Sequence, residues 1–252
     1  MRIVLLGAGN VATNIGLALK NAGHTPVQVY SRSETSARAL GQLLDTDWTA
    51  DKQSLLAADL YVLSVKDDAI ADCLQGMSLN GGVLAHTAGS VPMRVLAPYS
   101  NHFGVFYPLQ TFSKNKLVDF SKITAYIEAN DEYSKSNLIL FAEILQTTVR
   151  MADSQQRAQL HLAAVFACNF ANHMCTLADD LLKEAGLPFE DLLPLIDETT
   201  AKLHDMPPAE AQTGPARRGD KKIQQQHIEK LDDAKARIYQ LISDSIYNHA
   251  KL

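Results

Sequence analysis

The chain has 252 residues, of which 46% are hydrophobic and 20% are charged, and its formal net charge at pH 7 is -5. This length and apolar content suffice for one large domain or two modest ones with ordinary cores. The acidic balance argues against a nucleic-acid partner, which needs a basic face to displace counterions from the phosphate backbone. The short basic cluster ARRGDKK at 216–222 is interpreted as the solvated start of a helix.

Cysteine spacing and hydropathy predict the compartment. Cys73, Cys168 and Cys175 form no CxxC pair and show no Cys/His metal spacing, so we expect reduced, partly buried thiols and no metal site. Glycines interrupt the N-terminal apolar run too early for a signal-peptide core, and no run approaches membrane-spanning length. The patterns predict a cytoplasmic protein without a membrane partner.

Residues 2–152 alternate short β-rich runs with helical patterns. In chain order, we expect strands at 2–6, 27–30, 59–65, 81–86, 103–108, 122–129 and 147–152, and helices at 10–22, 34–44, 67–75 and 132–146. Strands that are separated by helices need crossover connections. The pattern therefore predicts an α/β domain with a doubly wound, mostly parallel Rossmann sheet.

The predicted secondary structure changes after Met151, because the remaining residues show helical patterns and no strand pattern. We expect a Rossmann domain at 1–152 and an all-α domain at 153–252. Asp153 and Gln156 have the spacing of a capping box, and the helix they open is expected to run to Gly186. Its apolar run Leu160–Phe170 needs more cover than a small helical domain gives, which predicts a homodimer.

The stretch LLGAGNVA at 5–12 lies between the first strand and the first helix. Gly7 allows a sharp turn, Gly9 allows the backbone to approach a pyrophosphate, and Ala12 allows close packing of helix on strand. The first helical amides supply donors and the positive end of the helix dipole. We therefore expect a dinucleotide to contact Gly7, Gly9, Asn10, Val11 and Ala12.

The end of the second strand indicates which dinucleotide binds. NAD enzymes place a carboxylate there against the ribose 2′-hydroxyl, but this chain has Ser31, Arg32 and Ser33. An arginine between two serines suits a 2′-phosphate instead, with Arg32 as its charge partner. The cofactor prediction is NADP(H); a solvated loop charge is the alternative for Arg32.

Several segments resemble known reductase families. SVK at 64–66 and LAHTAGSVP at 84–92 resemble the AVK segment and the SxAAG loop of pyrroline-5-carboxylate reductases. HTAGS, FYPLQTFS, HLAAVFACNFANH and QTGPARRGD together resemble a bacterial family classed as NADP oxidoreductases, whose C-terminal half is a domain of unknown function. The helical half also resembles 6-phosphogluconate dehydrogenase-like enzymes and deazaflavin-dependent NADP oxidoreductases. These resemblances imply the fold, NADP and a dimer, and they make Val65 and Lys66 candidate cofactor contacts.

Two departures from these families affect the expected chemistry. The reductases continue their sixth strand with Met-Pro-Asn, whereas this chain has Tyr107-Pro108-Leu109. Hydroxyacid dehydrogenase relatives carry a lysine four residues before an asparagine on the first long helix of the second domain. This chain has the asparagine, Asn169, but the residue four positions before it is Val165. The usual proton-donating lysine is therefore missing.

Three residues are candidates for supplying the proton that accompanies hydride transfer. His86 ends the fifth strand, where doubly wound folds bind ligands. His161 and Asn169 lie eight residues apart on one predicted helix, about 80° around it, so both could border one cleft. The alternatives are a loop or capping role for His86, a core histidine for His161, and a buried amide joining helices for Asn169.

The loop 213–220 supplies the candidate substrate-binding residues. Thr213 is a possible donor, Arg217 or Arg218 a carboxylate clamp, and Asp220 a carboxylate that orients an arginine.

The sequence thus predicts an NADP(H)-dependent oxidoreductase that transfers a hydride to or from a small carboxylate-bearing imine, ketone or alcohol. The alternative is a non-catalytic NADP(H)-binding sensor or scaffold, because the usual lysine is absent. A deazaflavin as hydride partner is a third alternative, which rests on resemblance.

Overall fold

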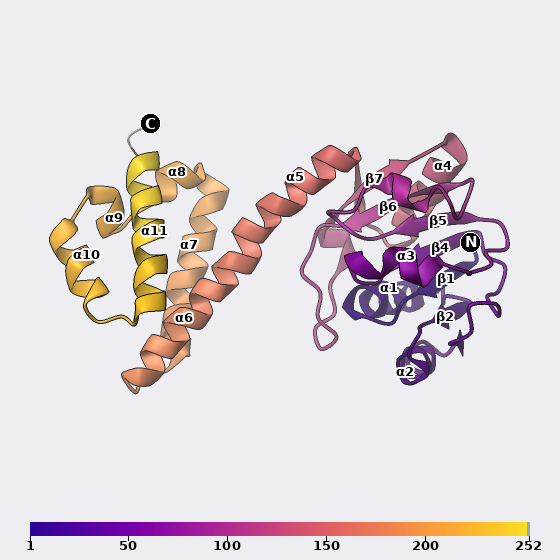
Figure 1. Cartoon of the computed structure of the whole chain (residues 1–252), viewed down its shortest axis with the longest axis horizontal. Coiled ribbons are helices and arrows are strands. Elements are labelled where there is room, and N and C mark those ends of the chain that lie inside the picture. Colours follow the sequence, from indigo (N-terminus) through magenta and orange to yellow (C-terminus); the bar gives the residue numbers. More distant parts are fainter. Residues whose placement is uncertain (251–252) are drawn as a thin grey trace. The chain divides into compact units, whose positions relative to one another are not determined.

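The computed structural model describes residues 1–250 and forms two compact units, Met1–Cys168 and a second that begins at Asn169. The first unit contains an eight-stranded sheet with helices, and the second is helical among its described residues (Figure 1). The predicted fold class, a mostly parallel doubly wound sheet followed by a helical region, is confirmed.

The sheet has the strand order β3-β2-β1-β4-β5-β6-β7-β8. Its strands are β1 (Ile3–Leu6), β2 (Gln28–Tyr30), β3 (Asp47–Thr49), β4 (Leu60–Leu63), β5 (Val83–His86), β6 (Phe103–Pro108), β7 (Thr124–Ala129) and β8 (Thr148–Met151). All seven predicted strands are present, and β3 is an additional edge strand. The order reverses at β1 and β4, so the switch point of the sheet lies between these two strands.

Strand direction divides the sheet into two parts. Strands β1 to β6 are parallel, β7 pairs with β6 antiparallel, and β8 pairs with β7 in parallel. Strand β8 therefore runs opposite to β1, and the helix that follows β8 starts at the opposite end from the helices that follow β1 and β2.

Helices cover both faces of the sheet because alternate strand residues point to opposite sides. Ile3 and Leu5 belong to the same core as residues of α1 (Asn10–Asn21), α2 (Glu34–Leu44) and α4 (Glu132–Ile144). Val4 and Leu6 belong to a second core with α3 (Ile70–Leu74) and the 3-10 turn Met93–Leu96. The buried strands read as continuous apolar runs for this reason.

The helix predicted from Asp153 begins with the expected capping box to Gln156. It continues as α5 (Ser154–Ala164), a π-helical segment Val165–Phe170, and α6 (Ala171–Glu184). The sequence placed the domain boundary at 152, one residue after the end of β8, whereas the first compact unit extends to Cys168. Helix α5 belongs to that unit because its buried Arg157 bonds to the sheet and its loops.

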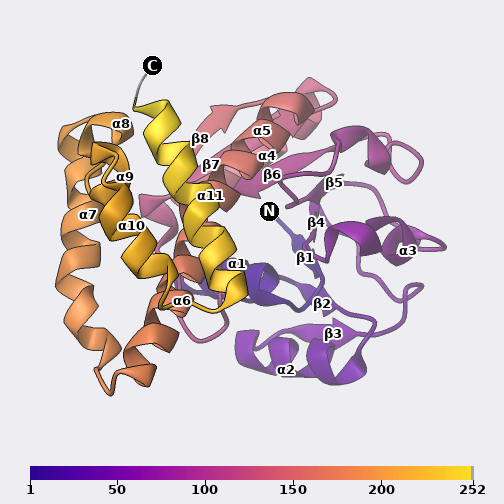
Figure 2. The same ribbon diagram turned by 60° about the vertical axis from the view of Figure 1, so that its left-hand side comes forward.

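The second unit also contains α7 (Leu193–Asp205), α8 (Pro208–Ala211), α9 (Pro215–Arg218), α10 (Lys221–Ile228) and α11 (Asp233–His249). Figure 2 shows α9 and α10 beside α11. The turn between α9 and α10 contains Gly219, at a position that requires a glycine. Gly219 has φ +69°, and a Cβ there would lie 2.8 Å from the Tyr247 ring. None of the helices within residues 1–250 has the length and apolar character needed to cross a membrane.

Candidate active site

A cavity of about 600 Å³ lies along the carboxyl ends of the parallel strands. Its lining comes from the ends of β2 and β6, from the turns after β1, β2, β4 and β5, and from residues of α1, α2, α3 and α5. The lining residues are Gly7, Ala8, Gly9, Asn10, Val11, Tyr30, Ser31, Arg32, Ser36, Ser64, Val65, Lys66, Asp67, Cys73, Thr87, Ala88, Gly89, Tyr107 and His161. Four strand spacings separate β2 from β6, roughly 19 Å. The cavity thus crosses the switch point, where doubly wound folds bind dinucleotides.

The glycine turn after β1 has the geometry that the sequence predicted. Gly7 has φ +121°, and a Cβ there would lie 2.3 Å from the Ser64 carbonyl oxygen. A Cβ at Gly9 would instead meet no protein atom within 4 Å, because it would point into open space at the cavity. Ala12 is fully buried in the core under α1. One glycine therefore fits the turn, and the other leaves room for a ligand to approach the backbone.

The first turn of α1 offers backbone donors to the cavity. The first intrahelical bond is donated by Thr13 N to Gly9 O at 2.9 Å, so the amides of Asn10, Val11 and Ala12 precede it. No acidic side chain lies in this turn, and no side chain caps it. The Asn10 amide side chain binds Phe112 O at 2.9 Å. The turn fits a pyrophosphate, because its free amides and the helix dipole favour an anion.

Of the polar residues in the turn after β2, some line the cavity and one caps helix α2. Ser31 and Arg32 line the cavity, together with Ser36, which the sequence analysis did not identify. Ser33 is not in the lining; its hydroxyl caps α2 by accepting from Ser36 N at 3.3 Å. The cap explains why a serine follows Arg32 and brings Ser36 to the cavity as a further hydroxyl.

The turn after β4 contributes Val65 and Lys66 to the cavity lining, and their contact with the cofactor stays a prediction. The adjacent Asp67 accepts a hydrogen bond from Ser90 Oγ of the loop after β5. Thr87 of that loop donates to Ser64 Oγ at 3.2 Å. These bonds hold the two turns together beside the glycine turn.

Tyr107 and His161 meet at the β6 end of the cavity. The Tyr107 hydroxyl lies 3.1 Å from His161 Nδ1, and the two rings contact each other edge to face. A Cβ at Gly89 would lie 2.8 Å from Tyr107 Cζ and equally close to His161 Nδ1. Burial raises the pKa of Tyr107, so the phenol keeps its proton at neutral pH. The sequence indicated His161, but it could not show that Tyr107 would be its partner.

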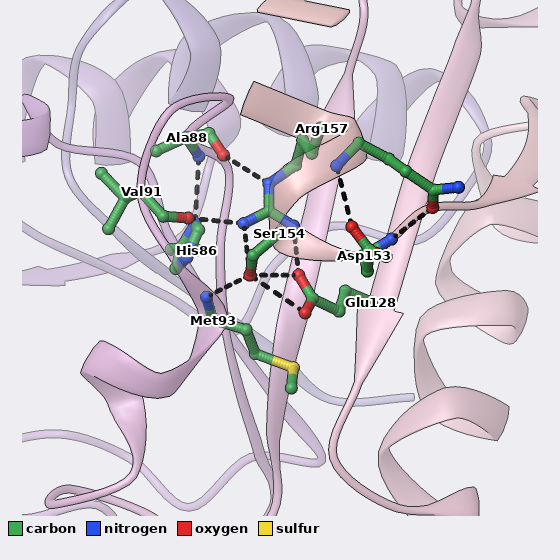
Figure 3. Close-up of polar contacts among 9 residues, drawn as sticks. His86, Ala88, Val91, Met93, Glu128, Asp153, Ser154 and Arg157 are labelled. Atoms are coloured by element: carbon green, nitrogen blue, oxygen red, sulfur yellow. Dashed lines mark hydrogen bonds and ion pairs between the residues drawn. The ribbon is translucent and has the colours of Figure 1, made fainter. Parts of the chain in front are cut away.

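A buried ion pair fixes the start of α5 to this end of the cavity (Figure 3). The Arg157 guanidinium is fully buried and pairs with the Glu128 carboxylate of β7. It also donates to Ala88 O at 3.3 Å and to Val91 O, both in the loop after β5. Ser154 Oγ donates to Glu128 Oε2 at 2.8 Å and accepts from Met93 N at 3.0 Å. The sequence analysis missed this network. The four-residue spacing of Asp153, Arg157 and His161 places these side chains on one helix face, and this spacing is the sequence feature that could have indicated it.

His86 immediately precedes the lining residue Thr87 in the chain but is not itself among the lining residues. Its side chain is fully buried, its Nδ1 accepts from Ala88 N at 3.2 Å, and its Nε2 has no hydrogen-bond partner within the described part of the chain. Burial, reinforced by the charge of Arg157, lowers the pKa of His86 to about 3. A neutral, enclosed imidazole is poorly suited to donate a proton, so we do not retain His86 as a candidate acid.

The remaining predicted site residues belong to the second unit. Asn169 is exposed and lies in the π-helical segment. The predicted angle of 80° between His161 and Asn169 is wrong for this helix, because the angle assumed α-helical geometry throughout and π-helical turns hold more residues.

The loop 213–220 is built differently from the predicted clamp. Thr213 and Arg218 are exposed, and Arg217 donates to Ala209 O at 3.2 Å. Asp220 caps α10 by accepting from Ile223 N at 3.3 Å, which gives its carboxylate a structural task. The four residues remain candidates for substrate binding. In residues 1–250, no cluster of three or more His, Cys, Asp or Glu side chains could hold a metal ion.

The fold and the glycine turn define a Rossmann-like protein with an added helical region. Residues 1–110 match the Rossmann-like domain, and residues 123–246 match a domain of unknown function, DUF2520. A crystal structure of a "putative NADP oxidoreductase" from Bacteroides fragilis is 46% identical, covers 98% of each chain and has a TM-score of 0.91. The chain therefore belongs to the family that joins a Rossmann-like domain to DUF2520.

More distant structures share the fold. The 1-pyrroline-5-carboxylate reductase of Streptococcus pyogenes is 14% identical, covers 100% of this chain and 98% of its own, and has a TM-score of 0.65. A reductive aminase from Aspergillus terreus, in complex with NADPH and ethyl-5-oxohexanoate, is 14% identical with a TM-score of 0.63, covering 100% of this chain and 88% of its own. No curated protein matches the chain.

Proposed function

We propose that the protein is an NADP(H)-dependent oxidoreductase that transfers a hydride to or from a small carboxylate-bearing imine, ketone or alcohol. The observation that carries the proposal is a continuous cavity that runs from Arg32, past the first turn of α1, to Tyr107 and His161. It joins an arginine, a set of backbone donors and a pair of proton-bearing side chains in the order that such a reaction requires.

The cavity residues fit the parts of NADP(H). Ser31, Arg32 and Ser36 present two hydroxyls and a guanidinium for the 2′-phosphate. The amides after Gly9 suit the pyrophosphate, and the loop Thr87–Gly89 lies where the nicotinamide end would reach across the switch point. NADPH, when bound, supplies the hydride for the reacting carbon. The Bacteroides fragilis relative, described as an NADP oxidoreductase, supports the same cofactor.

The substrate class is proposed from the reductases that share the fold and from the cations of the second unit. The reductases that share the fold are named for a cyclic imine carboxylate and for reductive amination. A carboxylate on the substrate would need a cation, for which Arg217 and Arg218 remain the candidates, and Asn169 remains a candidate contact. The proton is proposed to come from the cavity end at His161.

Replacing Arg32 by alanine tests the cofactor assignment. The dissociation constant for NADPH should rise by roughly 10- to 150-fold, the equivalent of about 1.5 to 3 kcal/mol, while that for NADH changes little. Arg38→Ala is the matched control, because Arg38 lies on α2 over the Trp48 ring, at 5.9 Å, and is not in the cavity lining. Equal losses for both dinucleotides, or tighter binding of NADH by the wild-type protein, would contradict the assignment.

Turnover separates an enzyme from a binding protein. The wild-type protein should oxidise NADPH in the presence of at least one member of a panel of imines and keto acids. Binding of NADPH without oxidation by any member of the panel would favour the sensor or scaffold instead.

We also propose that the protein is a cytoplasmic homodimer. Leu162 is 50% exposed and Phe166 is 65% exposed in the predicted interface segment, four residues apart, and packing against a second copy would remove this apolar surface from water.

A further inference from the structure

We propose that the Tyr107 hydroxyl is the acid that protonates the substrate, and that His161 returns a proton to it. This inference rests on the proposed reductase function and deepens it, because it assigns the proton to a particular atom. Tyr107 would be the catalytic residue, and His161 would act through it.

The position of Tyr107 carries the argument. Tyr107 is the last residue but one of β6, and its hydroxyl lies 3.1 Å from His161 Nδ1 at the β6 end of the cavity. Among the lining residues that follow β5, end β6 or stand on α5, which are Thr87, Ala88, Gly89, Tyr107 and His161, the two rings bear the titratable protons. The turn after β4 adds Lys66 and Asp67 to the same cavity, and Asp67 accepts a hydrogen bond from Ser90 Oγ. The Thr87 hydroxyl is already bonded to Ser64 Oγ and Leu63 O.

The different burial of His161 and Tyr107 suggests a path for the proton from solvent, through the imidazole, to the phenol. Tyr107 is 9% exposed, whereas His161 is half-buried and stands on α5. The imidazole can exchange protons with solvent, and the phenol lies deeper, toward the reacting atoms. The charged or titratable groups that act on the phenol are Arg157, which lowers its pKa, and Asp67 and Cys168, which raise it.

The surrounding structure holds the pair at this distance. Gly89 leaves no room for a larger residue against either ring, with 2.8 Å from its Cβ position to both. Arg157, one helical turn before His161, ties α5 to the same loop through Ala88 O and Val91 O. Both rings are therefore packed against a loop that is itself bonded to their helix.

The proposed step conserves atoms and charge. The reacting carbon gains a hydride from bound NADPH, and the π electron pair of the C=O or C=N bond moves to the oxygen or nitrogen. The substrate oxygen or nitrogen takes the proton from Tyr107 Oη. Tyr107 Oη then takes the Nδ1 proton of the His161 imidazolium, and solvent reprotonates the imidazole. The net reaction consumes one proton and yields an alcohol or amine with NADP⁺.

Kinetics of matched variants test the assignment. Single-turnover oxidation of NADPH is measured with members of the panel of imines and keto acids that the wild-type protein turns over, starting with 1-pyrroline-5-carboxylate and 5-oxohexanoate. Tyr107→Phe removes only the hydroxyl and should slow the step by about 100-fold or more, with the NADPH dissociation constant within about twofold of wild type. The double variant Tyr107→Phe/His161→Gln should be no slower than Tyr107→Phe, because His161 acts through the hydroxyl. Tyr133→Phe, on the exposed face of α4, is the control and should leave the rate unchanged.

A second readout does not depend on turnover. The ¹⁵N imidazole signals of His161, assigned by their loss in His161→Gln, should shift in Tyr107→Phe because Nδ1 loses its hydrogen-bond partner. Unchanged signals would overturn the pair. A Tyr107→Phe rate within threefold of wild type, or multiplicative losses in the double variant, would overturn the acid role alone. NADPH binding without oxidation by any member of the panel would overturn the proposed function together with the acid role.

Discussion

Replacing Arg157 by alanine tests how strongly the buried ion pair stabilises the first unit. Arg157 is 0% exposed and the Glu128 side chain 16% exposed, so neither charge is well solvated. The variant leaves Glu128 with Ser154 Oγ as a donor but without a counter-charge, and it removes a donor from Ala88 O. Breaking one side of a buried pair costs about 3–5 kcal/mol, which should lower the unfolding midpoint by roughly 10 °C.

The single tryptophan provides the assay. Trp48 lies in β3 and packs against Gly41 of α2, so its fluorescence follows unfolding of the first unit in urea or heat. Lys122→Ala, which removes the exposed pair with Asp119, is the control and should leave the midpoint unchanged. The double variant Arg157→Met/Glu128→Leu should recover much of the loss, because it leaves no buried charge unpaired. A loss below about 1 kcal/mol in Arg157→Ala would refute the reasoning.

Three further predictions follow from individual residues. Gly89→Ala should abolish reductase activity but retain NADPH binding in equilibrium titrations, because its Cβ would displace both rings that lie 2.8 Å away; full activity would contradict the packing. The pKa of His86 is lowered to about 3 in the folded protein, so the histidine takes up a proton in the unfolded chain first as the pH falls below about 6.5. The free energy of unfolding should therefore be about 2 kcal/mol lower at pH 5 than at neutral pH. In denaturant titrations, His86→Gln should remove that part of the pH dependence. Light scattering should show a dimer that Leu162→Glu/Phe166→Glu converts to a monomer, and a stable wild-type monomer at micromolar concentration would count against the proposed interface.

Much of the fold was predictable because buried parallel strands and amphipathic helices leave strong local patterns. Strand β3 escaped detection because it is three residues long with an exposed first residue. The direction of β7 escaped because a strand pattern carries no information on whether its neighbour runs parallel or antiparallel. The π-helical segment escaped for a related reason, since its residues have ordinary helical character.

The cofactor half of the site was more predictable than the catalytic half. The turn at Gly7 and Gly9 is local, so its spacing is visible in the sequence, and Ser31, Arg32, Val65 and Lys66 line the cavity. Their contact with a cofactor stays a prediction. The pairs Tyr107–His161 and Glu128–Arg157 join residues 54 and 29 positions apart. No local pattern specifies such contacts, which depend on the reversed direction of β8 and on the start of α5.

Helix α5 also makes the site sensitive to the number of residues in the chain. Asp153 caps the helix, Arg157 anchors it and His161 reaches Tyr107, each separated by four residues. Inserting one alanine between Arg157 and His161 would rotate the imidazole by about 100° while leaving every residue type in place. Part of the functional information therefore lies in a length rather than in residue identities. A substitution scan of α5 would miss it, whereas a scan of single-residue insertions and deletions would reveal it.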